Sequence, residues 1–468
     1  MVTIHLSAIG LTPTCYPKMD MNATNPSTPH ESLSERVFAA LESLYYSDSR
    51  PWVVAYSGGK DSTLVLQLVY EFLLKITNVS KADKPIFVIS SDTRVEAPNV
   101  SRYVTETLDR IRKAAEEHQI RLNTRLVSPS PEQSFWGKLI GLGYPPPTRW
   151  FRWCTTNMKI KPSRQAIGEI VRDFGSVILL LGTRSDESAA RRNAIAGRDT
   201  NARGLNPHHE IPNALVATPI VDWSNDDVWE YLYTNDPPWG GDHSFMLSLY
   251  RQANGGECPV VLDLNTPSCG GSRFGCWTCT VVKEDKSMQG FIQTGETWMQ
   301  PLAEFRDWLK DIREDPRRRN PLRRGEKIAG PGPFNALTRK EILERLLAME
   351  KQIGFELISD GDLKFIQHEW SKEFDYEQTV YKLARKYSRD IPMEEEQQIA
   401  SPEDELLEHC ALNEGFPPEL ARQLFETVRS RHADLDRWGA KTELQRELKT
   451  LIEKDVNQAL FADPAHDL

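Results

Sequence analysis

The chain has 468 residues, a length that suggests roughly two to three domains of about 150 residues each. Its 57 Lys and Arg against 67 Asp and Glu give a net charge of −10, which argues against a polycation that coats nucleic acid but leaves room for a local basic patch. No apolar run approaches the ~20 residues that span a bilayer, and the N-terminus lacks the pattern of a secretory signal. We therefore expect a cytoplasmic protein with no membrane association.

The first part of the chain alternates strands and helices. Residues 1–33 are rich in Thr, Pro, Asn and Ser and predict a flexible N-terminal arm. Residues 34–239 then predict a doubly wound, mostly parallel α/β sheet, because short apolar runs alternate with helical spacing. Helices are expected at residues 34–46, 64–72 and 96–118, and strands at 52–56, 85–91, 121–127 and 177–182.

The strand pattern fades in the second half. Residues 240–289 are rich in Gly, Pro and Cys without a regular period, which predicts a loop-like, Cys-rich subdomain that needs something to hold it together. Residues 290–468 predict a helical C-terminal region. Thr338 and Glu341 make a capping-box pattern at one helix start. Further helices are expected at 402–413, 418–432 and 440–460.

A glycine-rich turn, Ser57-Gly58-Gly59-Lys60-Asp61-Ser62, directly follows the first strand. Such a turn before a helix exposes backbone N–H groups and the positive end of a helix dipole, and both attract phosphate. It is not a GxxxxGK[ST] loop, because Asp61 separates Lys60 from Ser62. A plain turn is the alternative. The string resembles the pyrophosphate loop of the ATP pyrophosphatases, which implies that the turn cradles pyrophosphate, that Lys60 supplies charge, and that ATP is cleaved to AMP.

Asp92 ends the second predicted strand, where an open α/β sheet presents its ligand-binding groups. It is either such a group or a turn aspartate that caps the next helix. A magnesium ion bridging the phosphates is expected chemically, because negative charge builds up there. The sequence leaves open which carboxylate holds the ion.

A second cluster combines aromatic rings, cations and a thiol in residues 149–156. Together with Lys159 and Lys161, Arg149 and Arg152 put four cations within 13 residues, which favours an anion site. Cys154 lies among these basic groups, which predicts a lowered pKa. It is a candidate sulfur carrier or nucleophile, or else a wall residue of the anion site.

This cluster and two later segments resemble the sulfonucleotide reductases. The first match is Cys154…Lys159…Pro162, with Thr155 in place of a second Cys. The second match is Gly182-Thr183-Arg184-Ser185-Asp186-Glu187-Ser188 with Arg191, and it implies that a strand end delivers Arg184 to the nucleotide. The third match is the segment from Pro219 to Trp229. The resemblance further implies that Arg152, Glu187 and Arg191 bind the nucleotide. Solvated helix charges are the alternative for Arg184 and Arg191.

Four cysteines, Cys258, Cys269, Cys276 and Cys279, have the spacing C-x10-C-x6-C-x2-C. Four thiolates in an aperiodic, Gly-rich loop suit tetrahedral zinc or a cubane iron–sulfur cluster. The C-x-x-C pair is a strong local chelate, but spacing alone does not choose the metal. The remaining two cysteines, Cys15 and Cys410, belong to no motif.

Taken together, the motifs over residues 35–290 resemble the DndC-type proteins of bacterial DNA phosphorothioation systems, with the single-strand phosphorothioation protein SspD as a related possibility. The resemblance implies an adenine nucleotide α-hydrolase-like, PAPS reductase-like fold and a [4Fe–4S] cluster on the four spaced cysteines. It implies a sulfurtransferase that uses ATP and Mg²⁺ to activate a DNA phosphate, working with a cysteine desulfurase and other subunits. The residues implied to act in catalysis are Lys60, Asp61, Cys154, Lys159 and Arg184.

Two other functions stay open, a sulfonucleotide (PAPS or APS) reductase and a zinc-containing nucleic-acid scaffold without activity. Such a reductase usually has a redox-active cysteine near its C-terminal end, whereas no recognisable motif surrounds Cys410 in this sequence. A DNA-acting protein with net charge −10 must also localise its basic groups. One basic segment could provide such a DNA-binding patch, or else be a solvated charged linker. Its residues are Arg317, Arg318, Arg319, Arg323, Arg324 and Lys327.

Overall fold

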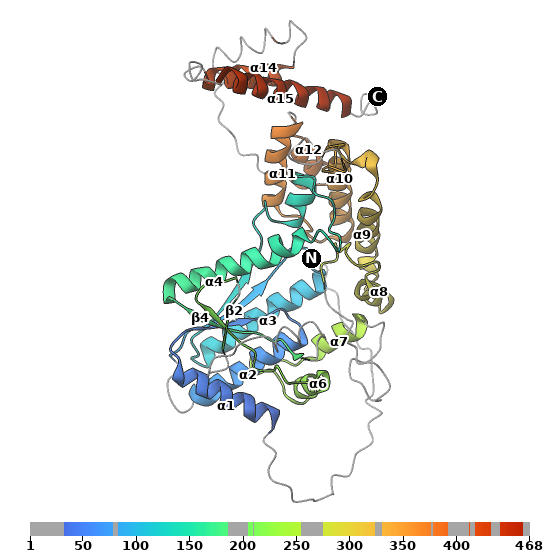
Figure 1. The fold of residues 1–468 in the computed structure, drawn as a ribbon. Helices are drawn as coiled ribbons and strands as arrows, with labels where there is room; N and C mark the ends of the chain where they lie inside the picture. The colour runs from blue at the N-terminus through green and yellow to red at the C-terminus, as the bar shows by residue number, and fades with distance from the viewer. Residues whose placement is uncertain are drawn as a thin grey trace, which may run out of the picture.

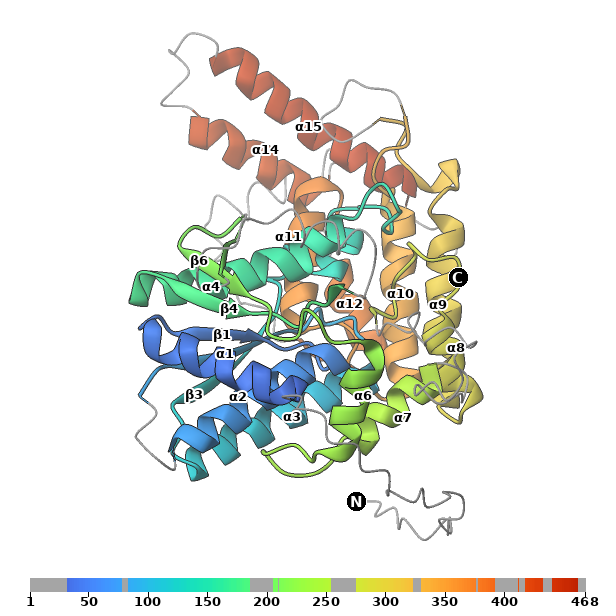
Figure 2. The same ribbon diagram turned by 60° about the horizontal axis from the view of Figure 1, so that its bottom comes forward.

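The computed structural model describes residues 32–77, 83–185, 205–208, 210–253, 275–322, 330–375, 378–391, 411, 417–431 and 440–461. At its centre is a six-stranded sheet with the order β3-β2-β1-β4-β6-β5 (Figures 1 and 2). All paired strands are parallel except β5 and β6, which are antiparallel. The strands are β1 (Trp52–Ala55), β2 (Ile86–Ser91), β3 (Leu122–Val127), β4 (Val177–Leu180), β5 (Asn206–Pro207) and β6 (Ala214–Ala217).

Helices cover both faces of this sheet (Figure 1). They are α1 (Leu33–Ser47), α2 (Lys60–Thr77), α3 (Pro98–Glu117), α4 (Lys161–Phe174), α6 (Asn225–Thr234) and α7 (Ser244–Ala253). Successive strand residues point to opposite faces. Trp52 and Val54 of β1 therefore join the core formed with α1, α2 and α3, whereas Val53 joins a separate core with α4. The predicted doubly wound, mostly parallel α/β sheet is confirmed.

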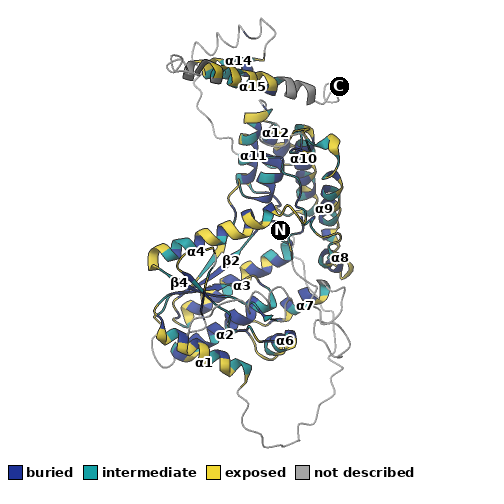
Figure 3. Ribbon diagram, viewed as in Figure 1, coloured by how far each residue is buried: buried dark blue, intermediate teal, exposed yellow. Residues whose placement is uncertain are grey.

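The position of α2 decides where a ligand can meet the sheet. This helix packs against β1, α1 and α6, and it is buried on most sides (Figure 3). It begins at Lys60, directly after the turn that leaves β1. The first N–H groups of a helix have no partner within the helix and carry its positive dipole end. The fold therefore aims these donors at the carboxyl edge of the sheet.

The predicted helical C-terminal region is also present. It shares a core with the sheet domain through a short π-helix, η1 (Gly137–Gly141). The indole of Trp370 donates a hydrogen bond to the carbonyl of Ile140 at 2.9 Å, and that of Trp136 donates to Leu357 at 2.6 Å. Residues 402–410 and 412–413 of one predicted helix lie outside the described residues. The helices are α8 (Lys286–Gln293), α9 (Gln300–Ile312), α10 (Ala336–Ile353), α11 (Asp360–Glu373), α12 (Thr379–Lys386), α14 (Pro418–Arg431) and α15 (Ala440–Phe461).

Local details differ from the sequence-based expectations. The N-cap of α10 is Asn335, whose side chain accepts the N–H of Thr338 at 3.0 Å, so the predicted capping box at Thr338 is wrong by one turn. Helix α7 lies within the segment expected to be loop-like, and β6 was not expected. Among the described helices, none combines the length and the apolar character that a bilayer-spanning helix needs.

Candidate functional site

The turn at residues 57–62 has a fixed shape. The hydroxyl of Ser62 donates to the carbonyl of Gly59 at 2.9 Å, which closes the turn on itself. Gly58 has a φ of +74°, and a Cβ there would lie 2.6 Å from Cγ2 of Val104 on α3. Only glycine adopts this conformation in this space without strain. The turn is therefore preformed, and it faces the N-terminal end of α2, where phosphate is attracted.

Three charged residues form a chain of ion pairs at this turn. Asp61 accepts a hydrogen bond from Nζ of Lys60 at 2.8 Å through one oxygen and from Nε of Arg184 at 2.7 Å through the other. The Arg184 side chain is 4% exposed and also donates to the carbonyl of Trp223 at 3.2 Å. Arg184 is thus a buried, oriented guanidinium and not a solvated helix charge. The structure brings these three predicted site residues together from the ends of β1 and β4.

Further close contacts hold the turn against its neighbours. A Cβ at Gly182, which follows β4, would lie 2.7 Å from the carbonyl oxygen of Asp61. On the other side, the hydroxyl of Tyr250 accepts the backbone N–H of Lys60 at 3.2 Å. Burial raises the pKa of Tyr250, so the hydroxyl stays neutral. Sequence reasoning missed Tyr250, because α7 lies in a segment without helical periodicity.

His243 ties the start of α7 to α2, and this contact predicts a pH dependence. The buried imidazole Nε2 lies 2.7 Å from Oε1 of Gln67, and burial lowers the pKa of His243 from 6.5 to about 4. Between these values the unfolded chain binds a proton that the folded chain does not, so acidification favours unfolding. We expect the free energy of unfolding to fall by up to about 3 kcal/mol between pH 6.5 and pH 4, at ~1.4 kcal/mol per pKa unit.

Urea denaturation at a series of pH values checks this expectation. A His243→Gln variant keeps a polar side chain without the titration and should show a shallower loss of stability towards low pH. Identical pH profiles for the wild type and the variant would contradict the assignment.

The second part of the site lies at the end of β2, on the same edge of the sheet. Asp92 accepts the N–H of Arg94 at 2.8 Å and closes a turn in which Arg94 has a φ of +59°. Asp92 is therefore a turn aspartate, and its carboxylate also lines the cavity described below. Lys159 lies with its Nζ 3.8 Å from Oε1 of Glu96. Burial raises the pKa of Glu96, and the charge of Lys159 opposes that effect.

Two thiols lie in one tight turn beside Thr93, and a third, that of Cys154, interacts with them through its charge. Sγ of Cys276 lies 3.4 Å from Oγ1 of Thr93, and the N–H of Cys279 donates to the carbonyl of Cys276 at 3.0 Å. Cys154, which precedes the π-helix η2 (Thr155–Ile160), lies near both: burial, and then the charge of Cys279, raises the pKa of Cys154. The pKa of Cys276 rises to about 11, mainly through burial, with a smaller contribution from the charge of Cys154. None of the three thiols forms a disulfide.

The pKa of Cys154 corrects one expectation. Its basic sequence neighbours predicted a lowered pKa, whereas the structure raises it, because the thiol is partly buried. The expected cations do not surround the thiol: the Arg152 side chain is exposed, and Lys159 is paired with Glu96. Cys154 therefore rests as a neutral thiol.

Cys276 and Cys279 are the described half of the predicted metal site, and Cys258 and Cys269 lie outside the described residues. Two free thiols in one tight turn match the chelate that C-x-x-C predicts, and soft sulfur donors suit iron or zinc. Within the described ranges, no three His, Cys, Asp or Glu side chains lie close enough to share a metal ion. The residues present fit half of a four-cysteine site, and Cys154 is a neighbour of it.

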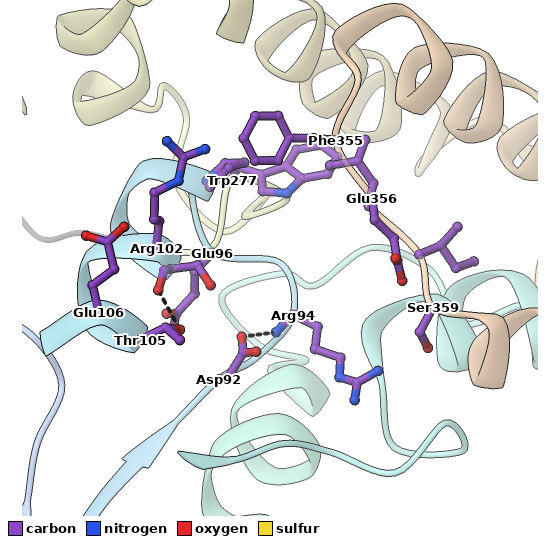
Figure 4. A pocket seen from close by; sticks show the side chains of 14 residues that line it. Asp92, Arg94, Glu96, Arg102, Thr105, Glu106, Trp277, Phe355, Glu356 and Ser359 are labelled. Carbon is purple, nitrogen blue, oxygen red and sulfur yellow. Dashed lines mark hydrogen bonds between the residues drawn. The ribbon is translucent and has the colours of Figure 1, made fainter. Parts of the chain in front are cut away.

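A cavity of about 560 Å³ opens at this edge of the sheet (Figure 4). Figure 4 shows Asp92 and Arg94 on one side and Phe355, Glu356 and Ser359 on the other. The second group comes from the loop between α10 and α11, which sequence reasoning missed because it carries no motif. The other lining residues are Glu96, Pro98, Ser101, Arg102, Thr105, Glu106, Trp277, Leu357 and Ile358.

The predicted basic patch is largely neutralised where the structure describes it. Arg317 pairs with Asp315 at 2.9 Å, and Arg318 pairs with Glu341. Arg319 donates to the carbonyl of Arg313 at 2.9 Å. These side chains therefore hold the local structure together. The remaining patch residues, Arg323, Arg324 and Lys327, lie outside the described residues, as do the predicted nucleotide-binding residues Glu187 and Arg191.

Comparison with known proteins identifies the sheet domain. Residues 51–282 match the family model of the phosphoadenosine phosphosulfate reductase domain. Two uncharacterised proteins of Methanocaldococcus jannaschii are 26% and 27% identical, over 58% and 39% of this chain. The chain spans only 46% and 36% of their lengths. The adenosine 5′-phosphosulfate reductase of Staphylococcus haemolyticus is 21% identical over 46% of this chain and 73% of its own.

Two solved structures also match parts of this chain at low similarity. A phosphoadenylyl-sulfate reductase from Candida auris in a phosphate complex is 14% identical and covers 45% of this chain and 89% of its own, with a TM-score of 0.26. An FMN adenylyltransferase from Candida glabrata, in complex with FAD and inorganic pyrophosphate, is 14% identical. The match covers 57% of this chain and 77% of that protein, with a TM-score of 0.30. The family match shows a PAPS reductase-like domain over residues 51–282.

Proposed function

We propose that this chain, built on a PAPS reductase-like domain, is a DNA phosphorothioation sulfurtransferase. It would cleave ATP to AMP and pyrophosphate and use the adenylyl group to activate a DNA backbone phosphate, one of whose non-bridging oxygens is then replaced by sulfur. One observation carries the proposal: a preformed Gly-rich turn at the start of α2, with a buried arginine beside it, lies at the same sheet edge as three free thiols. Activation by ATP and transfer of sulfur need these two chemistries near one another.

The turn at residues 57–62 would bind the phosphates of ATP through the donors at the start of α2. Lys60 and Arg184 would stabilise the negative charge that builds up during displacement at the α-phosphorus, and Asp61 positions both cations. Magnesium bound to the phosphates would neutralise further charge. Asp92 is a carboxylate at the same edge that is available to hold the ion.

The proposed reaction has two displacements. A non-bridging oxygen of a DNA phosphodiester attacks the α-phosphorus of ATP, and the bond from that phosphorus to the bridging oxygen breaks as pyrophosphate leaves. The DNA phosphate then carries AMP through an anhydride, which converts an inert oxygen into a good leaving group. A sulfur nucleophile attacks the DNA phosphorus, and AMP departs with the oxygen that began on the diester. Each ATP exchanges one oxygen for one sulfur.

Cys154 is the residue that we assign to carry the sulfur, as a persulfide. Its outer sulfur attacks the DNA phosphorus and forms a Cys154–S–S–P linkage as AMP departs. A first external thiol then attacks Sγ of Cys154 and releases the phosphorothioate, and a second thiol resolves the mixed disulfide, restores the cysteine and leaves as a disulfide with the first. Lys159, on the adjoining π-helix, would add positive charge beside this group of thiols, since its charge lowers the pKa of Cys276. A cysteine desulfurase is the expected sulfur source, and other subunits of a phosphorothioation complex would help to hold DNA.

Cys258, Cys269, Cys276 and Cys279 are the residues that we assign to a [4Fe–4S] cluster. A bound cluster would supply thiophilic iron beside Cys154. Anaerobically purified protein should therefore be brown, with broad visible absorbance and about four irons per chain. Cys276→Ser should lose most of the iron, and Cys410→Ser should keep it. Colourless protein with one zinc per chain would instead support the zinc alternative.

The function itself is tested in a complete reaction of the chain with DNA, ATP, cysteine, a desulfurase and the partner subunits. We expect pyrophosphate and DNA phosphorothioate to form in equal amounts, measured by an enzyme-coupled assay and by mass spectrometry of nuclease-digested DNA. DNA that gains no sulfur would contradict the proposal. Locating the phosphorothioate on one strand or on both strands of a duplex separates an SspD-type from a DndC-type product.

A sulfonucleotide reductase is the second candidate, favoured by the 21% identity to an adenosine 5′-phosphosulfate reductase. It predicts sulfite release from adenylyl sulfate or its 3′-phosphorylated form in the presence of thioredoxin, without DNA or ATP. Our proposal predicts no sulfite in that assay.

A further inference from the structure

Residues 148–152 form an exposed tip directly before Cys154. Trp150 is 97% exposed at this tip. The residues beside it are anchored: the ring of Phe151 stacks on Tyr144 with an interplanar angle of 9°, and Trp153 is buried. The tip is therefore held by aromatic packing while one large indole is left in solvent. The indole therefore offers a free π-face on which another ring can stack.

Exposed positive charge collects at the same tip. Arg149 and Arg152 flank the exposed indole, both are exposed, and neither forms an ion pair within the described ranges. Residues 133–168 contain six Lys and Arg and no Asp or Glu, in a chain whose net charge is −10. Arg317, by contrast, is paired with a carboxylate. The tip therefore suits a polyanion better than the basic segment does.

The base of the tip is tied to the thiols. The carbonyl of Pro147 accepts hydrogen bonds from Oγ1 of Thr280 at 2.8 Å and from the guanidinium of Arg313 at 3.0 Å. Thr280 directly follows Cys279, and Cys154 follows the tip by two residues. A ligand held on the tip is thus held next to the group of thiols.

We propose that Trp150 stacks on an unpaired DNA base while Arg149 and Arg152 bind the adjoining phosphates. This inference rests on the proposed function in that DNA is taken as the substrate. An exposed aromatic ring between guanidiniums is the arrangement with which proteins hold unstacked bases, because stacking needs a free π-face and the backbone needs cations. The site assigns the substrate class: a single-stranded or locally unstacked stretch of DNA at the modified phosphate.

The test measures binding of the full chain to a labelled single-stranded oligonucleotide by fluorescence anisotropy, without ATP or a sulfur source. Trp150→Ala should weaken binding about tenfold or more, the usual effect of losing one base stack. Trp150→Phe should retain most of the affinity, because it keeps an aromatic face. Tyr46→Ala removes another exposed ring, 63% exposed on α1, and should change nothing.

A second measurement tests the two arginines through the salt dependence of DNA binding. Arg149→Gln should lower the slope of log affinity against log salt by about 0.7, the contribution of one phosphate contact on a single strand. Arg172→Gln, an exposed cation on α4, is the matched control and should leave the slope unchanged. Because neither arm uses ATP or sulfur, a failure of the proposed chemistry would leave these results intact.

Wild-type DNA affinity in Trp150→Ala would overturn the inference. If that variant also lost a partner subunit in a reconstitution of the complex, the tip would be a protein interface instead.

Discussion

Cys154→Ser should abolish sulfur incorporation into DNA while pyrophosphate is still released from ATP. The thiol lies in the group with Cys276 and Cys279 and takes no part in the ion pairs at the turn of residues 57–62. Serine fills nearly the same space but forms no persulfide. We expect the yield of phosphorothioate to fall at least about 100-fold, since the covalent sulfur carrier is lost.

The two products separate the roles. Phosphorothioate is counted by mass spectrometry and pyrophosphate by a coupled assay on the same sample. Cys410→Ser is the matched control, because that cysteine belongs to no motif, and it should keep both products. If Cys154→Ser transfers sulfur at the wild-type rate, Cys154 is not the carrier.

Removing the Arg184 guanidinium should lower ATP-dependent pyrophosphate release by about 100-fold or more, as expected for one preorganised charge at a phosphoryl centre. Arg184→Ala also removes the buried partner of Asp61, which then keeps only its ion pair with Lys60, so the variant will lose stability. Its melting temperature must therefore be measured beside its activity.

A Lys60→Gln variant tests the role of the turn in pyrophosphate release with less effect on the stability of the fold. The Lys60 side chain is 12% exposed and pairs with Asp61, so its loss should disturb packing less than that of Arg184. We expect a similar loss of pyrophosphate release with a nearly unchanged melting temperature. Arg112→Gln removes an exposed cation on α3 and serves as the control. Wild-type release by a well-folded Lys60→Gln would show that the turn does not bind the reacting phosphates.

The sequence predicts the sheet well because its signals are local. Short apolar runs such as residues 177–180 are the strands, and the Gly-rich turn lies where its strand–turn–helix context indicates. The pairing of Arg184 with Asp61, 123 residues apart, could not be read from periodicity. It follows from the strand order, which places β4 beside β1.

The errors arise where tertiary packing decides. Cys154 has basic sequence neighbours, yet burial sets the direction of its pKa shift. Arg317 belongs to a basic run, yet it has a carboxylate partner two residues away. Tyr250 and Phe355 reach the site from segments without motifs, so nothing in a single sequence marks them.

The central claim is that ATP activates the DNA phosphate itself. Its most direct test uses DNA whose non-bridging oxygens at the modified phosphate are both ¹⁸O, with unlabelled ATP and water. The account predicts that the AMP released in step with phosphorothioate carries one ¹⁸O atom, because AMP leaves with an oxygen of the diester. Phosphorothioate formed alongside AMP that contains only ¹⁶O would contradict it, since ATP would then have been cleaved by water or used elsewhere.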